Sequence, residues 1–341
     1  MEMRRQRYVY NLGLLGFVVV LSIVMSEIFC RHYFARDLHL IENPDHRLKS
    51  NRYDTNSDGI RSDKEAGEFV ERALNIIVLG DSYVYGYRQK AHDTFPQQLE
   101  KLARKEFADE TINVANFGWV SSSPILSLRL LQDIGGHYNP DIVILCIDMT
   151  DFQDDLKYEY ILSRPWNLRL FPGLTTLVRK ALTRLSRRMG WADSLHKRIF
   201  GFPGDRFFVV NQPLDRSLEF CSPLIHNIDE IARFSTEELD ARFLVVILPR
   251  SFQYSEKECP LNWEKYGYTV LGEYCLEPFR LFEETARTRP YPIHSLLAPF
   301  RDTSEFPTCF KRDPHWTKKG NRVAAKAVYE ILQDEGLLPA Q

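Results

Sequence analysis

The stretch NIIVLGDSYVYG, residues 75–86, joins a short apolar run to a polar turn. The run does not alternate with polar residues, which is typical of a strand buried on both faces of a parallel sheet. Gly80, Asp81 and Ser82 follow it directly. A serine on a turn between a strand and a helix exposes its hydroxyl, and the N–H groups of the helix N-terminus point toward it. Ser82 is therefore a candidate nucleophile, although a serine here also serves as a helix cap.

Further apolar runs of the same kind follow along the chain, with helical patterns between them. The runs are TINVANFG (111–118), DIVILCIDM (141–149) and RFLVVILP (242–249), and the clearest helical patterns cover 95–107 and 123–135. Strands that alternate with helices indicate βαβ units. We predict an α/β fold of the flavodoxin-like, three-layer α/β/α type with a central parallel sheet, in which ligands bind beyond the carboxyl ends of the strands.

The C-terminal part of the chain carries the second chemical motif, DPHWTKKG, directly before a helical pattern. Asp313 stands two residues before His315. An aspartate so placed on a loop can orient the imidazole, and the imidazole can accept the proton of Ser82. A turn with a surface histidine would give the same tripeptide, but its pairing with the GDS turn favours a catalytic triad.

Four blocks of this sequence, in this order, resemble those of the SGNH or GDSL-like hydrolases. They are GDSYVYG, NVANFGWVSSSP, NPDIVILCIDMTDFQDD and DPHWTKKG. The resemblance covers roughly residues 50–155 and 290–335. It implies that Ser82 is the nucleophile, His315 the general base and Asp313 its orienting carboxylate, and that neither a metal nor an organic cofactor is required.

The same resemblance implies an oxyanion hole made of the Ser82 N–H, an N–H of the second block and a side chain of the third. The glycine of the second block is replaced by Ser121 here, with Gly118 as the fallback, and the asparagine of the third block is replaced by Thr150. A threonine hydroxyl reaches less far than an asparagine amide. Losing one such donor lowers the rate about 10²–10³-fold.

The DPHWTKKG block also resembles the Asp-x-His-Trp-Thr block of polysaccharide O-acetyltransferases of the alginate type. We therefore expect a serine esterase that cleaves an O-acyl ester, in particular O-acetyl, on a cell-envelope glycan or another ester substrate. One alternative is an O-acetyltransferase with the same triad. The other is a catalytically impaired module that binds or assembles envelope glycans.

The N-terminus predicts a membrane anchor. Arg4, Arg5 and Arg7 precede an uncharged stretch of 19 residues, Tyr8–Ser26, which spans roughly 28 Å as a helix. This order of charges predicts a single pass through the inner (cytoplasmic) membrane, with the body on the periplasmic or extracellular side. A cleaved signal peptide has the same charge order and is the alternative.

We divide the chain into an anchor with a cytoplasmic tail (1–30), a juxtamembrane lead-in (31–74) and a catalytic domain (75–341). Insertions are expected at about 158–215 and 251–290. The first insertion contains the basic pattern LTTLVRKALTRLSRRMG. This pattern fits a solvated helix packed by its leucines, or a cap that faces an anionic substrate or the membrane surface.

Charge and cysteine content restrict the remaining possibilities. The chain has 44 basic and 46 acidic residues, so no overall field attracts nucleic acid. An oxidising compartment permits disulfides, and we expect up to two among Cys221, Cys259, Cys275 and Cys309, with Cys259–Cys275 as the short one. No CxxC or HxxxH spacing supports zinc.

The segment DTNSDGIRSDKE, residues 54–65, has acidic residues at calcium-loop spacing. The segment before it has no helical pattern, which an EF-hand requires, and the lead-in to the first strand of SGNH-like proteins explains the same residues. We do not expect calcium there.

Overall fold

The computed structural model describes the chain except residues 1, 36, 39–54, 108–111, 187–188 and 340–341. The chain divides into two compact units. One unit comprises the described residues of 1–46 and 159–204, and the other comprises those of 47–158 and 205–341. Asp54, the first position of the calcium-like segment, lies outside the described residues.

The larger unit is built on a five-stranded sheet in which every pairing is parallel. Its order is β2-β1-β3-β4-β5. The bounds are Leu74–Gly80 (β1), Ile112–Gly118 (β2), Ile142–Ile147 (β3), Arg242–Ile247 (β4) and Ile293–Ser295 (β5). This is the flavodoxin-like order, so the predicted fold class is confirmed. The chain reverses its direction across the sheet at β1, whose carboxyl end therefore lies at the switch point where such folds bind ligands.

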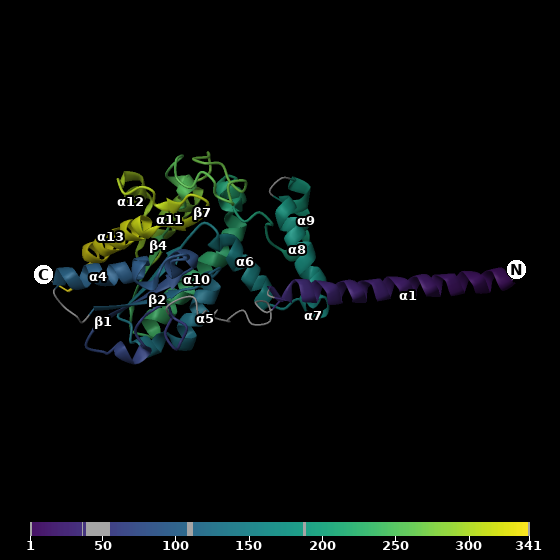
Figure 1. Cartoon of the computed structure of the whole chain (residues 1–341), viewed down its shortest axis with the longest axis horizontal. Coiled ribbons are helices and arrows are strands. Elements are labelled where there is room, and N and C mark those ends of the chain that lie inside the picture. The colour runs from purple at the N-terminus through teal and green to yellow at the C-terminus, as the bar shows by residue number, and fades with distance from the viewer. Residues whose placement is uncertain (1, 36, 39–54, 108–111, 187–188, 340–341) are drawn as a thin grey trace. The chain divides into compact units, whose positions relative to one another are not determined.

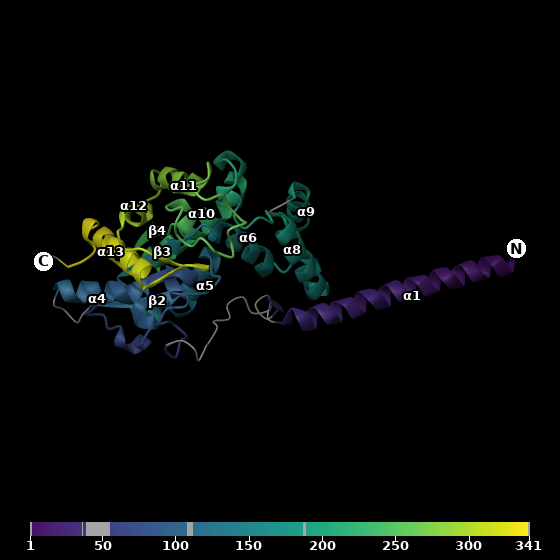
Figure 2. The same ribbon diagram turned by 45° about the horizontal axis from the view of Figure 1, so that its top comes forward.

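Helices cover both faces of the sheet (Figures 1 and 2). On one face, Ile76 and Val78 of β1 share a buried cluster with Leu99 of α4 (Phe95–Phe107) and Val328 of α13 (Lys318–Asp334). On the other, α5 (Pro124–Ile134) packs against α10 (Leu218–Glu237). The continuous apolar character of the strands follows from this double burial.

The remaining elements of this unit are short, apart from α6 and α11. They are α3 (Ser82–Tyr85), α6 (Asp151–Leu162, whose residues from 159 on belong to the smaller unit), α11 (Glu277–Ala286), α12 (Leu297–Asp302), β6 (Cys309–Phe310), β7 (Asp313–Trp316), and the 3₁₀ turns Ala66–Glu68, Ala91–Asp93, Gly135–Tyr138, Phe208–Val210, Leu214–Arg216 and Ser251–Gln253. The DPHW segment was expected as a loop, but it forms β7, which pairs antiparallel with β6.

The smaller unit contains α1 (Glu2–Tyr33), α7 (Trp166–Leu170), α8 (Pro172–Ser186) and α9 (Gly190–Phe200). Helix α1 is long and apolar enough over Arg5–Tyr33 to cross a membrane, and its apolar 18-residue window has a mean hydropathy of 2.4. A signal sequence would have the same properties. Part of the first predicted insertion thus belongs to the same unit as the N-terminal helix.

The expected Cys259–Cys275 disulfide is wrong, because all six cysteines are free, buried thiols. The Cys259 thiol donates a hydrogen bond to the Asp313 carbonyl at 3.1 Å. The Cys309 sulfur lies 3.3 Å from the Tyr254 hydroxyl. Each thiol is used as a small buried side chain, which the polar sequence around these cysteines did not indicate.

Gly118, at the end of β2, allows α3 to approach the sheet. An added Cβ would lie 2.1 Å from the Tyr85 nitrogen and 2.6 Å from the Val84 carbonyl carbon. We expect Gly118→Ala to destabilise the larger unit by about 2–4 kcal/mol, because backbone must move. Gly67→Ala is the matched control, since nothing lies within 4 Å of its added Cβ. Chemical unfolding of the full chain, followed by tryptophan fluorescence, measures both; equal midpoints for the two variants would contradict the steric argument.

Candidate active site

The turn after β1 presents Ser82 as the first residue of α3. Gly80 has φ of +154°, and an added Cβ would lie 2.4 Å from Val84 and 3.0 Å from the Cys146 carbonyl oxygen. Asp81 caps the helix, since its carboxylate accepts the Tyr83 N–H at 2.8 Å. The cap that Ser82 was weighed for is thus supplied by Asp81, which leaves the Ser82 hydroxyl available for other partners.

Ser82, His315 and Asp313 lie in one hydrogen-bonded row. The Ser82 Oγ is 2.8 Å from Nε2 of His315, and Nδ1 of the same ring is 2.5 Å from Oδ1 of Asp313. The other oxygen of Asp313 lies 3.5 Å from Nη1 of Arg88. In the tautomer with its proton on Nδ1, the ring donates to Asp313 and accepts the Ser82 proton, which is the relay that activates a serine.

Tyr83 of the GDSYVYG motif and Tyr87, the residue directly after the motif, hold the histidine in place. The Tyr83 hydroxyl donates to the Pro314 carbonyl at 2.8 Å, which ties α3 to β7. The ring centroids of Tyr83 and Tyr87 lie 5.3 and 4.8 Å from that of His315. Sequence reasoning missed these contacts, although Tyr83 lies within the motif and Tyr87 directly follows it.

The Asp313 carboxyl stays ionised beside the imidazole. Burial alone would raise its pKa, but the hydrogen bond from His315, the charge of that ring and the Arg88 guanidinium together hold the pKa below its ordinary value. A carboxylate that keeps its charge stabilises the imidazolium formed when the histidine takes a proton.

The backbone at the second block supports one of the two candidate donors. Ser121 has φ of +60°, the left-handed conformation that favours glycine, as the family pattern implies. The Gly118 N–H already donates to Oδ1 of Asn116 at 2.9 Å. Of these two N–H groups, we therefore favour that of Ser121. The Ser82 N–H, at the first position of a helix, has no acceptor within that helix.

Thr150 is placed differently from the expectation. It is fully buried, and its hydroxyl donates to Oδ1 of Asp148 at 2.7 Å. The Thr150 N–H donates to the same oxygen at 2.6 Å, and Arg250 donates to the Thr150 oxygen at 3.3 Å. A threonine hydroxyl has one proton, and here that proton is directed to Asp148 and not toward Ser82.

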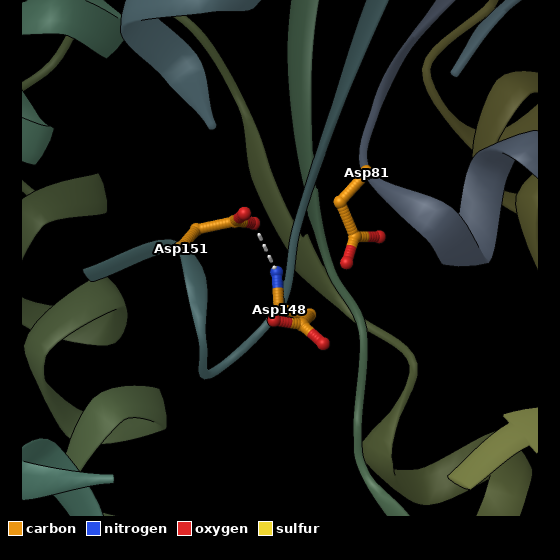
Figure 3. A group of neighbouring side chains, drawn as sticks. All are labelled: Asp81, Asp148 and Asp151. Atoms are coloured by element: carbon orange, nitrogen blue, oxygen red, sulfur yellow. Dashed lines mark hydrogen bonds between the residues drawn. The ribbon is translucent and has the colours of Figure 1, made fainter. Parts of the chain in front are cut away.

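Three carboxyl groups lie together at the carboxyl ends of β1 and β3 (Figure 3). Oxygens of Asp81, Asp148 and Asp151 are within 4.8 Å of one another. The Arg250 Nε donates to Asp148 at 2.8 Å, and another nitrogen of this guanidinium pairs with Glu264. Such oxygens suit a hard cation, but Arg250 already supplies positive charge at Asp148.

Burial and mutual repulsion set the charges of this acidic cluster. Burial first, then the charge of Asp148, raise the pKa of Asp81 to about 7. Burial first, then Asp148 and Asp81, raise that of Asp151 well above its ordinary value. Burial also acts to raise the pKa of Asp148, but Arg250 and the two Thr150 hydrogen bonds outweigh it and lower that pKa. The ionised member is therefore Asp148.

Asp81 also touches the candidate nucleophile. Its Oδ2 lies 3.2 Å from the Ser82 Oγ, so an ionised Asp81 competes with His315 for the one hydroxyl proton. The cluster was missed in the sequence, although Asp81 follows one predicted strand, Asp148 lies near the end of another (141–149), and parallel strands end at the same edge of a sheet.

No model of a known protein family matches the sequence, and no curated protein matches it. Solved structures with a similar fold include a member of the lipolytic protein G-D-S-L family from Veillonella parvula DSM 2008 (10% identity, 76% of this chain and 99% of that chain, TM-score 0.42). An acetyl xylan esterase, AlAXEase, has 11% identity over 76% of this chain and 100% of its own (TM-score 0.42). TesA has 11% identity over 76% and 99% (TM-score 0.43).

The features of this chain that bear on its chemistry are its own sheet order, its motifs and the geometry around Ser82.

We expect Tyr83→Phe to lower kcat about 5–10-fold with little change in KM. The substitution leaves the buried Pro314 carbonyl without its donor and loosens the segment that carries His315. Tyr87→Phe is the matched control, because it keeps the ring beside His315 and no hydrogen bond of its hydroxyl is among those described. Steady-state hydrolysis of p-nitrophenyl acetate gives both constants. An equal effect of the two substitutions would argue against the Pro314 contact.

Asp81→Asn should flatten the pH dependence of stability. The folded protein holds the Asp81 proton more tightly than the unfolded chain, so stability is greatest at acidic pH and falls as the pH rises through about 7. Asparagine keeps the oxygen that accepts the Tyr83 N–H but does not ionise. Unfolding midpoints measured between pH 5 and 8 should fall less for the variant than for the wild type, and parallel curves would refute the raised pKa.

Considering the sheet order and the four motif blocks together, the chain has the α/β/α fold expected from its sequence, that of the SGNH and GDSL-like hydrolases.

Proposed function

We propose that this chain is a serine esterase, anchored by α1, that cleaves an O-acyl ester through an acyl-enzyme intermediate. The observation that carries the proposal is the continuous row from the Ser82 hydroxyl through His315 to Asp313, with separations of 2.8 and 2.5 Å. These groups come from parts of the chain more than 200 residues apart. A capping serine and a surface histidine have no reason to meet in this geometry.

In the proposed reaction, the Ser82 oxygen bonds to the ester carbonyl carbon while its proton passes to Nε2 of His315. The imidazolium then gives this proton to the departing alcohol oxygen as the ester C–O bond breaks. Water attacks the acyl-enzyme with His315 as general base, and the carboxylic acid leaves as Ser82 recovers its proton. Asp313 keeps the ring in the required tautomer throughout.

The oxyanion of each tetrahedral intermediate is proposed to accept hydrogen bonds from the N–H groups of Ser82 and Ser121. The helix N-terminus at Ser82 adds its dipole to the first of these. Thr150 has a positioning role in this proposal: its hydroxyl and N–H fix Asp148, which in turn binds Arg250. The site then operates with fewer side-chain donors than the family pattern implies.

The substrate that we propose is an O-acetyl ester on a cell-envelope glycan. Two features of the chain support this choice: the likeness of DPHWTKKG to the block of alginate-type acetyltransferases, and an N-terminal helix long and apolar enough to span a membrane. The basic residues at the start of that helix support the inner membrane, with the larger unit on the periplasmic side. Transfer of the acyl group to a sugar hydroxyl is the alternative second step, since it requires the same acyl-enzyme.

A fluorophosphonate probe tests the nucleophile directly. We expect it to label the full chain in detergent at Ser82, as read by peptide mass spectrometry, and Ser82→Ala to abolish both labelling and acetyl-ester hydrolysis, about 10⁶-fold if the three residues act as a unit. Ser222→Ala, on an exposed part of α10, should retain both. Labelling elsewhere, or hydrolysis that persists without Ser82, would refute the esterase and transferase hypotheses alike.

Asp313→Asn should lower kcat about 10³–10⁴-fold with KM nearly unchanged, because the amide favours the wrong tautomer of His315. Arg88→Gln is the comparison variant, for which we expect a smaller loss of kcat. Its contact with Asp313 is 3.5 Å long and half exposed to solvent, so we expect a loss below about 10-fold. Comparable losses in the two variants would mean that Asp313 acts through charge at a distance and not by orienting the ring.

Adding a sugar acceptor distinguishes hydrolysis of the acyl-enzyme from transfer of its acyl group to a sugar hydroxyl. The products of a labelled acetyl donor are measured with and without an oligosaccharide. Free acetate in both cases supports hydrolysis, whereas acetylated oligosaccharide at the expense of acetate supports transfer.

A further inference from the structure

Helices α7, α8 and α9 expose large apolar side chains that the fold of the smaller unit does not use. Trp166 is 71% exposed and Leu170 62%, one helical turn apart on α7. On α9, Trp191, Leu195 and Ile199 are also exposed. Large exposed apolar side chains that gather on one surface mark a site that meets a membrane or a partner.

The two faces of α9 show that this exposure is separate from folding. Ala192, His196 and Phe200 form a buried stripe at positions i, i+4 and i+8, and α9 packs closely against α8. The stripe formed by Trp191, Leu195 and Ile199 repeats the same spacing, displaced by one residue. One apolar stripe of α9 therefore packs in the interior of the unit, and the second faces outward.

Helix α8 continues this outward surface. Leu177 and Val178 are exposed, while Thr175, Thr176 and Leu182 are buried. We call the large exposed apolar side chains within α7, α8 and α9 the apolar face; its members are Trp166, Leu170, Leu177, Val178, Trp191, Leu195 and Ile199.

The start of α8 is fixed against the end of α1. The buried Glu27 carboxylate accepts the N–H groups of Gly173 and Leu174 at 2.9 and 2.8 Å. An added Cβ on Gly173 would lie 2.8 Å from the Arg31 nitrogen, so the two backbones are in close contact. Glu27 is the first charged residue after the uncharged stretch. The apolar face therefore begins where the apolar part of α1 ends.

Both α8 and α9 run across the direction of α1 (Figures 1 and 2). If α1 crosses the bilayer, α8, which meets it at Glu27–Arg31, and α9, which packs against α8, lie along the boundary between lipid and water. Tryptophan is the residue that favours this boundary, and an amphipathic helix in this plane buries its apolar face to roughly 5–10 Å depth.

The charge of this segment indicates the kind of lipid. Residues 164–200 contain nine lysines and arginines and one acidic residue, Asp193. Arg184 and Arg198 are exposed on α8 and α9 beside the apolar side chains. Each basic residue near an anionic membrane surface adds about 1 kcal/mol to its attraction.

We propose that the apolar face of α7–α9 lies in the headgroup layer of a bilayer containing anionic phospholipid, as a second membrane attachment beside α1. The inference rests on the proposed membrane anchoring of this chain. It does not depend on the esterase activity. The chain is then held at two places, a spanning helix and a helical hairpin in the interface.

Tryptophan fluorescence tests this arrangement in the full chain. Helix α1 contains no tryptophan, two of the five tryptophans are buried (Trp119 and Trp316), and Trp263 of the larger unit is exposed to the same extent as Trp191, at 59%. The chain is incorporated into nanodiscs of phosphatidylglycerol and phosphatidylcholine, with or without bromine on the acyl chains near the headgroups. We expect bromine to quench the emission, and the double variant Trp166→Phe/Trp191→Phe to lose at least half of that quenching.

Trp263→Phe is the matched control and should leave the quenching unchanged. Replacing phosphatidylglycerol by phosphatidylcholine should reduce the quenching at least 2-fold, and Arg184→Gln/Arg198→Gln should reduce this lipid dependence. The proposal is overturned if bromine does not quench the emission, or if the Trp166→Phe/Trp191→Phe variant keeps more than half of the quenching. It is also overturned if those two residues respond to protein concentration in detergent and not to bromine, which would assign the face to a second copy.

Two parallel measurements separate this inference from the proposed function. Alkaline carbonate extraction reports whether α1 spans the membrane, and acetyl-ester hydrolysis reports on the triad. If the chain resists extraction and hydrolyses ester, but Trp166 and Trp191 are not quenched, only the membrane contact of the apolar face is refuted. A chain released by carbonate would remove the anchor on which it rests.

Discussion

The candidate site depends on the hydrogen bond between the Ser82 hydroxyl and Nε2 of His315, which joins the turn after the first strand to the segment before the last helix. Other contacts of the fold are needed to place Ser82 and His315 in this geometry. Gly80 turns the chain so that Ser82 opens α3, and the Tyr83 hydroxyl binds the Pro314 carbonyl, which seats β7 beside that helix. The contact that holds the histidine is thus supplied by the residue next to the nucleophile.

A buried network of charged side chains supports the turn between β1 and α3. Arg250 pairs with Asp148 and Glu264, and each of these groups is buried. Desolvating such charges is unfavourable, and removing one partner of a buried pair typically destabilises a protein by about 3–5 kcal/mol. The network therefore constrains the carboxyl ends of β1 and β3 strongly. It also places the Asp81 carboxyl, whose pKa burial and the charge of Asp148 raise to about 7, at 3.2 Å from the oxygen of the candidate nucleophile Ser82.

The smaller unit differs in keeping a set of large apolar side chains exposed. Its interior is satisfied by contacts among α1, α8 and α9 and by the Glu27 cap on α8, yet it keeps a second set of apolar side chains outward. In water such a surface is unfavourable, whereas at a lipid boundary it is stabilising. Apolar side chains therefore have different roles in the two units. Those of the sheet in the larger unit are covered by helices, and those of the apolar face on α7–α9 remain available to a bilayer.

Local patterns in the sequence determined the four longest strands, the apolar N-terminal helix and the candidates Ser82, Asp313 and His315, because strand burial, helix periodicity and turn chemistry are read within a few residues. The three-residue strand β5 was too short to leave a pattern. Tertiary structure decided the rest. Arg250 lies about a hundred residues from Asp148 and Thr150, so the direction of the Thr150 proton has no local signature. The thiols of Cys259 and Cys309 found hydrogen-bond partners in distant segments instead of each forming a disulfide, because the packing of the chain, and not the spacing of cysteines, sets which atoms meet.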